Sequence, residues 1–197
     1  MNPEFAVLAS FPLAKGTRFE HPPEHPELIR LDSPAVTVMT DFKFVYPVTI
    51  SPTVAIDGAL KKMKTAGVRL LLVTSEAGEV IGIVTADDIM GERPIRIIEE
   101  TRIQRPDINV SMVMTPQPRI TVLNHLGGLN AKVGEIIETL HRLERQHVLV
   151  VDTDESAGVQ RIVGIFSTSQ ISKLLGRDVT EEIPPAHSLA EIVRKIG

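Results

Sequence analysis

Cysteine is absent from the 197-residue chain. Without a thiol there is no disulfide, no thiolate zinc site, no iron–sulfur cluster and no cysteine nucleophile. Aromatic residues are also scarce, at 4%, with no Trp and a single Tyr, and the net charge is −4. Proteins that bind nucleic acid usually carry a basic surface or exposed stacking rings. Nucleic acid is therefore not an expected partner.

Long hydrophobic runs are absent too. No apolar stretch approaches the roughly 20 residues that a membrane-spanning helix needs, so we expect no membrane insertion. Residues 5–14 are largely apolar, but no basic residue precedes them and Pro12 interrupts them, which argues against a signal peptide. With 43% apolar and 23% charged residues, the composition is that of a globular protein, and we expect it in the cytoplasm.

Prolines divide the chain unevenly, since six of the 14 fall in the first 35 residues. Proline fixes an extended backbone and donates no hydrogen bond, so residues 1–35 are predicted to be an arm rather than part of a core. His21 to His25 spell H-x-x-E-H, but two prolines inside the motif prevent the helix that a zinc site would need, and we expect no metal. Residues 176–197 are predicted to be a tail with a short helix from Ser188, whose apolar stripe could contact a partner.

The middle of the chain repeats itself. Met39-Thr40 matches Met114-Thr115, the apolar run that begins at Arg69 matches the run that begins at His147, and Gly82-Ile-Val-Thr matches Gly164-Ile-Phe-Ser in the same order. Each half is predicted as strand, helix, strand, turn, strand and helix. Parallel strands joined through a helix require a right-handed crossover, so two small α/β halves packed together are expected.

Local signals place the elements of each half. In the first half we predict a strand over residues 47–50, a helix that begins at Ser51-Pro52 and ends at Gly67, strands over 70–73 and 80–84, and a helix from Thr85. In the second half, residues 152–161 are predicted to be a longer polar loop. His125, with the glycines at 127 and 128, is predicted to lie in an extra flexible loop.

The repeated pieces resemble a tandem pair of CBS domains, a family named after cystathionine β-synthase, over residues 36–175. The resemblance implies an α/β fold in which each repeat is a three-stranded mixed sheet with two helices, and the two repeats pack about a pseudo-two-fold axis. It places the first repeat with its connecting segment at residues 36–108 and the second at 109–175. It also implies a homodimer.

The resemblance further implies a regulatory protein without catalytic residues or a covalent cofactor. Members of the family bind adenosine-containing ligands, namely AMP, ADP, ATP or S-adenosylmethionine, in clefts between the repeats, and they act on a partner protein. By position, Thr85 and Asp88 would hold the ribose hydroxyls, since a fixed carboxylate can accept from two neighbouring hydroxyl groups. The other residues that match the first site are Ser51, Val68 and Ile83 around the base, and His147 with Arg145 at the phosphates.

The second half departs from the family pattern. Ser167 keeps the hydroxyl, but Gln170 replaces the acid, and a neutral amide accepts hydrogen bonds less strongly than a carboxylate. Arg69 would face the phosphates of this site, and Ile165 and Gln146 complete its set. We expect the second site to be weak or empty.

Other interpretations of these residues stay open. Thr85-x-x-Asp88 and Ser167-x-x-Gln170 also fit helix-capping patterns, and Arg69 and His147 could extend from buried strands to the protein rim. The connecting segment holds four arginines that could clamp a polyphosphate: Arg93, Arg96, Arg102 and Arg105. Three glutamates alternate with them, which favours a solvated helix face with ion pairs.

A second function also stays open, in which the chain is a ligand-free docking module for an enzyme or transporter. In that case the arm, the arginines and the C-terminal stripe would contact the partner. The degraded second motif, with Gln170 in place of the acid, favours this alternative.

Overall fold

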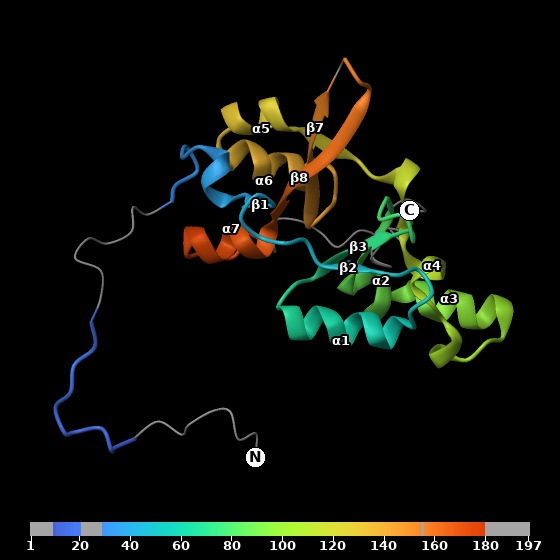
Figure 1. Cartoon of the computed structure of the whole chain (residues 1–197), viewed down its shortest axis with the longest axis horizontal. Helices are drawn as coiled ribbons and strands as arrows, with labels where there is room; N and C mark the ends of the chain where they lie inside the picture. The colour runs from blue at the N-terminus through green and yellow to red at the C-terminus, as the bar shows by residue number, and fades with distance from the viewer. Residues whose placement is uncertain (1–9, 21–28, 155, 180–197) are drawn as a thin grey trace, which may run out of the picture.

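The structure of the chain is a computed structural model that describes residues 10–20, 29–154 and 156–179. The predicted C-terminal helix and the H-x-x-E-H motif lie outside the described residues. The chain folds into two four-stranded mixed sheets, ordered β1-β8-β7-β6 and β2-β3-β4-β5. Figure 1 shows them as two groups, with the second half in yellow and orange and the first in cyan and green. The predicted α/β class with two related repeats is confirmed, but each sheet has four strands rather than the predicted three.

The first half follows the predicted order of elements. β2 (Thr49–Ile50), α1 (Ile56–Ala66), β3 (Leu70–Thr74), β4 (Val80–Thr85) and α2 (Ala86–Met90) follow one another. β2 pairs with β3 in parallel, and β3 pairs with β4 antiparallel. α1 ends at Gly67, whose φ of 66° is a left-handed conformation that glycine adopts without a steric penalty.

The predicted start of α1 at Ser51 is wrong. The helix begins at Ile56 because residues 51–54 form a turn, in which the amide of Val54 donates to the carbonyl of Ser51. The helix N-terminus is instead held by the connecting segment. The amide of Ile56 donates to the carbonyl of Ile108, and the amide of Val110 donates to the carbonyl of Val54. Such a contact between distant parts of the chain leaves no local capping signal.

The second half repeats the same order. Its elements are β6 (Val122–Asn124), α6 (Val133–Arg142), β7 (His147–Asp154), β8 (Val159–Ser167) and α7 (Thr168–Leu175). The predicted loop over residues 152–161 is shorter than expected, because β7 continues to Asp154 and β8 begins at Val159. The resulting hairpin projects at the top of Figure 1.

Each sheet receives its fourth strand from the segment that precedes the other repeat. β1 (Thr40–Asp41) pairs with β8, and β5 (Thr115–Pro116) pairs with β4. The Met-Thr repeat is therefore a strand that crosses between the halves. Each sheet contains a strand from the segment that precedes the other repeat, so the sheets do not mark the domain boundaries. The boundaries predicted at residues 36, 109 and 176 stay predictions.

Helices and short turns connect the halves and their ends. α3 (Glu92–Thr101), η2 (Arg105–Asp107), α4 (Val110–Val113) and η3 (Gln117–Arg119) form the connecting segment. η1 (Ala35–Val38) precedes β1, and α5 (His125–Asn130) follows β6. Within the described ranges, no helix combines the length and the apolar content needed to cross a membrane.

Buried apolar side chains form three clusters. One lies under the helices of the first half and includes Ile56, Val84 and Ile89. The second lies under the helices of the second half. The third joins the two sheets through Leu70 and Leu72 of β3 and Leu149 of β7. Each sheet is therefore covered by helices on one side and packs against the other sheet on the opposite side, which explains its unbroken apolar strands.

The segment from residue 29 onward is anchored to the second half. The carbonyls of Leu31 and Ser33 accept from the amides of Gly134 and Val133 at 2.9 Å each. These amides open α6 and have no partner inside the helix, so the segment caps that helix. Ala35 and Val38 are fully buried in the second-half cluster. Residues 10–20, in contrast, extend away from the two sheets in Figure 1.

Candidate functional site

Thr85 and Asp88 interact directly at the start of α2. The Thr85 hydroxyl accepts from the Asp88 amide at 3.2 Å, and Asp88 Oδ2 accepts from the amide and the hydroxyl of Thr85 at 2.9 and 2.8 Å. The capping interpretation of this motif is confirmed, since the two residues form a capping box. The same bonds fix the Asp88 carboxylate in one orientation, with 13% of the side chain exposed. A ligand role for the pair stays a prediction.

Arg93 is a partner of Asp88 that the sequence analysis missed. Its Nη1 lies 2.9 Å from Asp88 Oδ1 and donates to the carbonyl of Val113 at 2.6 Å. Arg93 does not belong to the predicted solvated helix face with ion pairs, because its guanidinium turns back toward α2. The signal was weak, since the spacing of five residues crosses the junction between two helices at Gly91.

Two other arginines of the connecting segment follow the ion-pair interpretation. Arg96 pairs with Glu92 at 3.0 Å one turn earlier in α3, and Arg105 pairs with Asp57 of α1 at 3.1 Å. Arg102 ends α3 with a φ of 59°. Because the paired guanidiniums are bound to different carboxylates, the described structure does not assemble a polyphosphate clamp here.

The corresponding position in the second half has a simpler cap. Ser167 Oγ accepts from the amide of Gln170 at 3.2 Å, at the N-terminus of α7. The capping interpretation is confirmed for this motif as well. Gln170 brings no negative charge to the position, so the motif itself lacks the carboxylate that Asp88 supplies to the first half.

Strand pairing corrects the alignment of the two apolar runs by one position. Leu70 lies opposite Thr85 and His147 lies opposite Ser167, so His147 corresponds to Leu70. Arg69 corresponds to Gln146, because their carbonyls accept from the first amides of α2 and α7. The prediction failed because both runs are continuously apolar and lack the alternation that fixes register, and a one-residue shift reverses the face of every side chain.

The corrected register places His147 on the same face of β7 as Leu149, toward the other sheet. Removal from water and, to a lesser extent, the nearby Arg69 guanidinium lower the pKa of His147 to about 4, while Asp87 acts in the opposite direction. His147 is therefore neutral at pH 7. The imidazole is partly buried, so the rim alternative for His147 stays a prediction.

Arg69 and Asp87 belong to the first half, and both lie close enough to His147 in the second half to affect its pKa. Arg69 Nη2 lies 3.0 Å from Asp87 Oδ1, and each side chain is about half exposed, at 49% and 52%. Arg69 thus brings a positive charge that water can reach. Together with the imidazole it forms a small polar group beside the interface between the sheets.

The remaining predicted residues lie in different surroundings. Ile83 and Ile165 meet in the apolar cluster that joins the sheets, so residues assigned to two different sites share one interface. Val68 packs against the first-half cluster. Ser51 and Arg145 are exposed, and Gln146 is partly buried.

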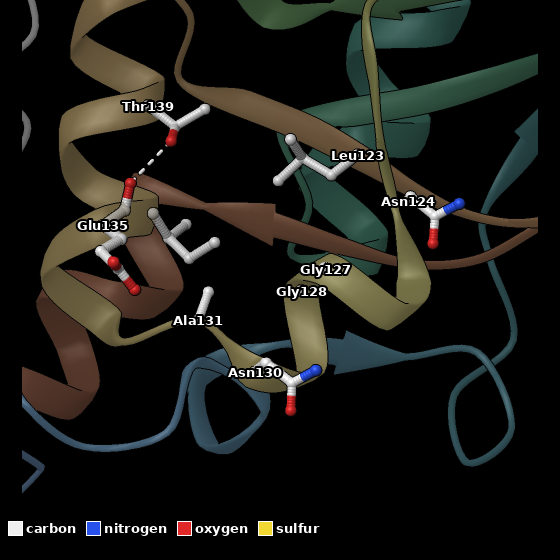
Figure 2. Close-up of a pocket in the computed structure, with 9 residues that line it drawn as sticks. Leu123, Asn124, Gly127, Gly128, Asn130, Ala131, Glu135 and Thr139 are labelled. Atoms are coloured by element: carbon white, nitrogen blue, oxygen red, sulfur yellow. Dashed lines mark hydrogen bonds between the residues drawn. The ribbon is translucent and has the colours of Figure 1, made fainter.

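A separate pocket lies in the second half, where the sequence analysis expected a flexible loop. Residues 125–130 form the short helix α5, so that prediction is wrong. A cavity of about 350 Å³ lies between α5, α6 and the end of β6. Figure 2 shows the side chains that line it. Leu123 and Ile136 give it apolar walls, and Glu135 is the acidic residue that lines it. None of its lining residues belongs to either predicted site.

Comparison with known proteins supports the repeat architecture. Residues 36–94 match the family model of the CBS domain. An uncharacterized conserved protein from Pyrococcus horikoshii is 25% identical with a TM-score of 0.53, over 74% of this chain and 93% of that protein. A conserved CBS domain protein of unknown function from Thermoplasma acidophilum has 18% identity and a TM-score of 0.53, over 77% of this chain and 74% of that protein. The search of curated proteins finds no match.

Proposed function

We propose that this chain, a member of the CBS-domain proteins with two repeats in tandem, binds the adenosine part of a nucleotide where its repeats meet. The observation that carries the proposal is the Asp88 carboxylate, which Thr85 holds in a fixed orientation at the start of α2. A carboxylate fixed in this way can accept hydrogen bonds from the vicinal hydroxyls of a ribose without first losing side-chain entropy. AMP, ADP, ATP and S-adenosylmethionine all carry such a ribose.

Binding of the base and the phosphates extends the proposal across the interface. Ile83 offers an apolar surface for the adenine, and Ser51 and Val68 lie on the same half. At the phosphates of this site, the neutral His147 can donate a hydrogen bond, and Arg145, which is exposed just before β7, is the candidate cation. Arg69, which is paired with Asp87, remains the candidate cation for the phosphates of the second site. The second site, built on Ser167 and Gln170, is proposed to bind weakly or not at all.

The proposed role is regulatory. A ligand that contacts both repeats stabilises one of their relative orientations by the difference in its affinity for the two. A partner protein that recognises that orientation would receive the signal, and a homodimer of this chain would present two such modules. The family membership supports this role rather than a catalytic one.

A docking module without a ligand is the second candidate. Two observations favour it. The Asp88 carboxylate already has an ionic partner in Arg93, and the described part of the arm exposes more than 80% of Phe11, Leu13 and Phe19. Exposed apolar side chains of this size are frequent at protein–protein contacts.

A thermal-shift panel separates the two candidates. The purified chain is heated with AMP, ADP, ATP, S-adenosylmethionine or NAD, and a ligand of the folded state raises the unfolding midpoint. We expect at least one adenosine ligand to raise the midpoint of the wild type but not of Asp88→Ala, because loss of the charged acceptor weakens binding tenfold or more, on the order of 1.5 to 3 kcal/mol. Each shift is measured against the same variant without ligand.

Asp57→Ala is the matched control, because Asp57 is also ion-paired with an arginine but lies in α1. Its ligand-induced shift should equal that of the wild type. Equal shifts in Asp88→Ala would disprove the site assignment. Flat midpoints for every ligand at concentrations above a millimolar would favour the docking module.

A further inference from the structure

Arg93 connects the proposed ribose-binding acid to the segment that leads into the second half. A single nitrogen, Nη1, contacts both Asp88 Oδ1 at 2.9 Å and the carbonyl of Val113 at 2.6 Å. Val113 is the last residue of α4, and β5 begins two residues later as the strand that pairs with β4. Asp88 and the strand exchanged between the repeats are therefore linked through one side chain.

The hydrogen bonds of Asp88 show that this link competes with a ribose. An ionised carboxylate offers about four acceptor positions, two on each oxygen. The amide and hydroxyl of Thr85 occupy both positions on Oδ2, and Arg93 occupies one on Oδ1. One position is left, whereas two vicinal hydroxyls that both donate to the carboxylate need two.

Arg93 is the partner that can leave at least cost. The bond from the Thr85 amide belongs to the capping box that starts α2, and the Thr85 hydroxyl, which makes the other bond, also accepts from the Asp88 amide in that box, so displacing Thr85 would loosen the helix. Arg93 comes from α3, and 39% of its side chain is exposed, so water can solvate its guanidinium after release. A ribose that binds through both hydroxyls would therefore displace Arg93.

We infer that Arg93 is an affinity-setting competitor at the nucleotide site, and that its displacement by the ribose releases the Val113 carbonyl at the end of α4. This inference rests on the proposed function, because it needs a ligand with a vicinal diol at Asp88. It adds a route by which ligand binding at Asp88 can affect the structure of the second half. The carbonyl that loses its donor lies just before Met114 and Thr115, which lie against β4 of the first sheet.

Titration of Arg93→Gln tests the competition. AMP and adenosine are titrated into the wild type and the variant by calorimetry, and adenosine is included because it carries the ribose without a phosphate. We expect Arg93→Gln to bind both about 2- to 5-fold more tightly, the range of a partly exposed ion pair. Arg93→Lys, which keeps the charge, should fall between the two and serves as the second variant if the glutamine variant does not fold.

Arg96→Gln is the matched control, because Arg96 lies one turn further along the same helix and pairs with Glu92 rather than with Asp88. Its affinity should match that of the wild type. Unchanged or weaker binding by Arg93→Gln, with wild-type binding intact, would overturn the inference alone. Binding by none of these proteins would overturn the proposed function together with the competition.

A ligand-free measurement tests the link to α4. Replacement of Asp88 by Asn removes the charge that holds Arg93, so the amides of Met114 and Thr115 should exchange hydrogen faster in Asp88→Asn than in the wild type. Asp57→Asn, which frees Arg105 instead, should leave these amides unchanged. Equal exchange at residues 114 and 115 in Asp88→Asn and the wild type would overturn the link, whatever the nucleotide experiments show.

Discussion

Gly82 of β4 lies directly against Met114. A Cβ at Gly82 would come within 2.7 Å of Met114 Sδ and within 2.9 Å of the Thr115 carbonyl oxygen. The second half has the same arrangement, since a Cβ at Gly164 would lie 3.0 Å from Met39 Sδ and 2.9 Å from the Thr40 carbonyl oxygen. Each repeated motif therefore begins with glycine because the Met-Thr strand from the other half packs directly against this position.

Replacement of Gly82 by alanine should therefore destabilise the fold. The added methyl group cannot be accommodated without moving the backbone of β5, and overpacking of this kind costs about 1–3 kcal/mol. The free energy of unfolding is measured by urea denaturation. Gly127→Ala is the matched control, because a Cβ at Gly127 would meet nothing within 4 Å. A Gly82→Ala protein as stable as the control would contradict the packing of the exchanged strand.

The neutral state of His147 predicts a pH dependence of stability. Its folded-state pKa of about 4 lies below the ordinary value of 6.5. Between these pH values the unfolded chain binds more protons, so the free energy of unfolding falls as the pH decreases from 6.5 to 4. Full protonation of His147 in the unfolded chain lowers the free energy of unfolding by at most about 3 kcal/mol, because the side chain is partly buried.

His147→Leu should remove that part of the pH dependence, because leucine does not titrate and Leu70 already occupies the corresponding position of the first half. Urea denaturation at pH 4.5, 5.5 and 7 measures the difference between wild type and variant. His141→Leu changes an exposed histidine of α6 and should keep the wild-type slope. An equal slope in His147→Leu would show that His147 is accessible to protons in the folded state.

η1 tests whether the residues that precede β1 pack in the hydrophobic core of the second half. Val38 is fully buried in the second-half cluster, whereas Val36, on the same turn, is 40% exposed. Val38→Ala should lower the free energy of unfolding by about 1–3 kcal/mol because it leaves a cavity, and Val36→Ala should change it by less than about 0.5 kcal/mol. The free energy of unfolding of both variants is measured by urea denaturation. Equal losses of stability in Val38→Ala and Val36→Ala would argue against the burial of η1.

The sequence was most informative where the signals are local and repeated. The order of strands and helices in both halves follows from apolar periodicity, and the capping box of Thr85 and Asp88 follows from a four-residue spacing. Two copies of the same pattern also made the repeat visible without any long-range information.

Features that depend on contacts between distant residues could not be predicted in this way. β1 and β5 are two residues long, too short for a periodic signal, and their partners lie in the other repeat. The register of β7 was misread because every position of its apolar run suits a buried strand. The Arg93–Asp88 pair depends on how α3 turns back over α2, which is a property of packing rather than of the local sequence.

The exchanged strands also determine what would happen if the chain were cut. A break in the connecting segment between α3 and α4 would leave β5 on one fragment and its partner β4 on the other, and it would separate β1 from β8 in the same way. Each fragment would expose the unpaired edge of a sheet, which promotes aggregation. The two pieces should therefore complement each other when they are produced together and fail when they are produced apart, as the halves of a split reporter do.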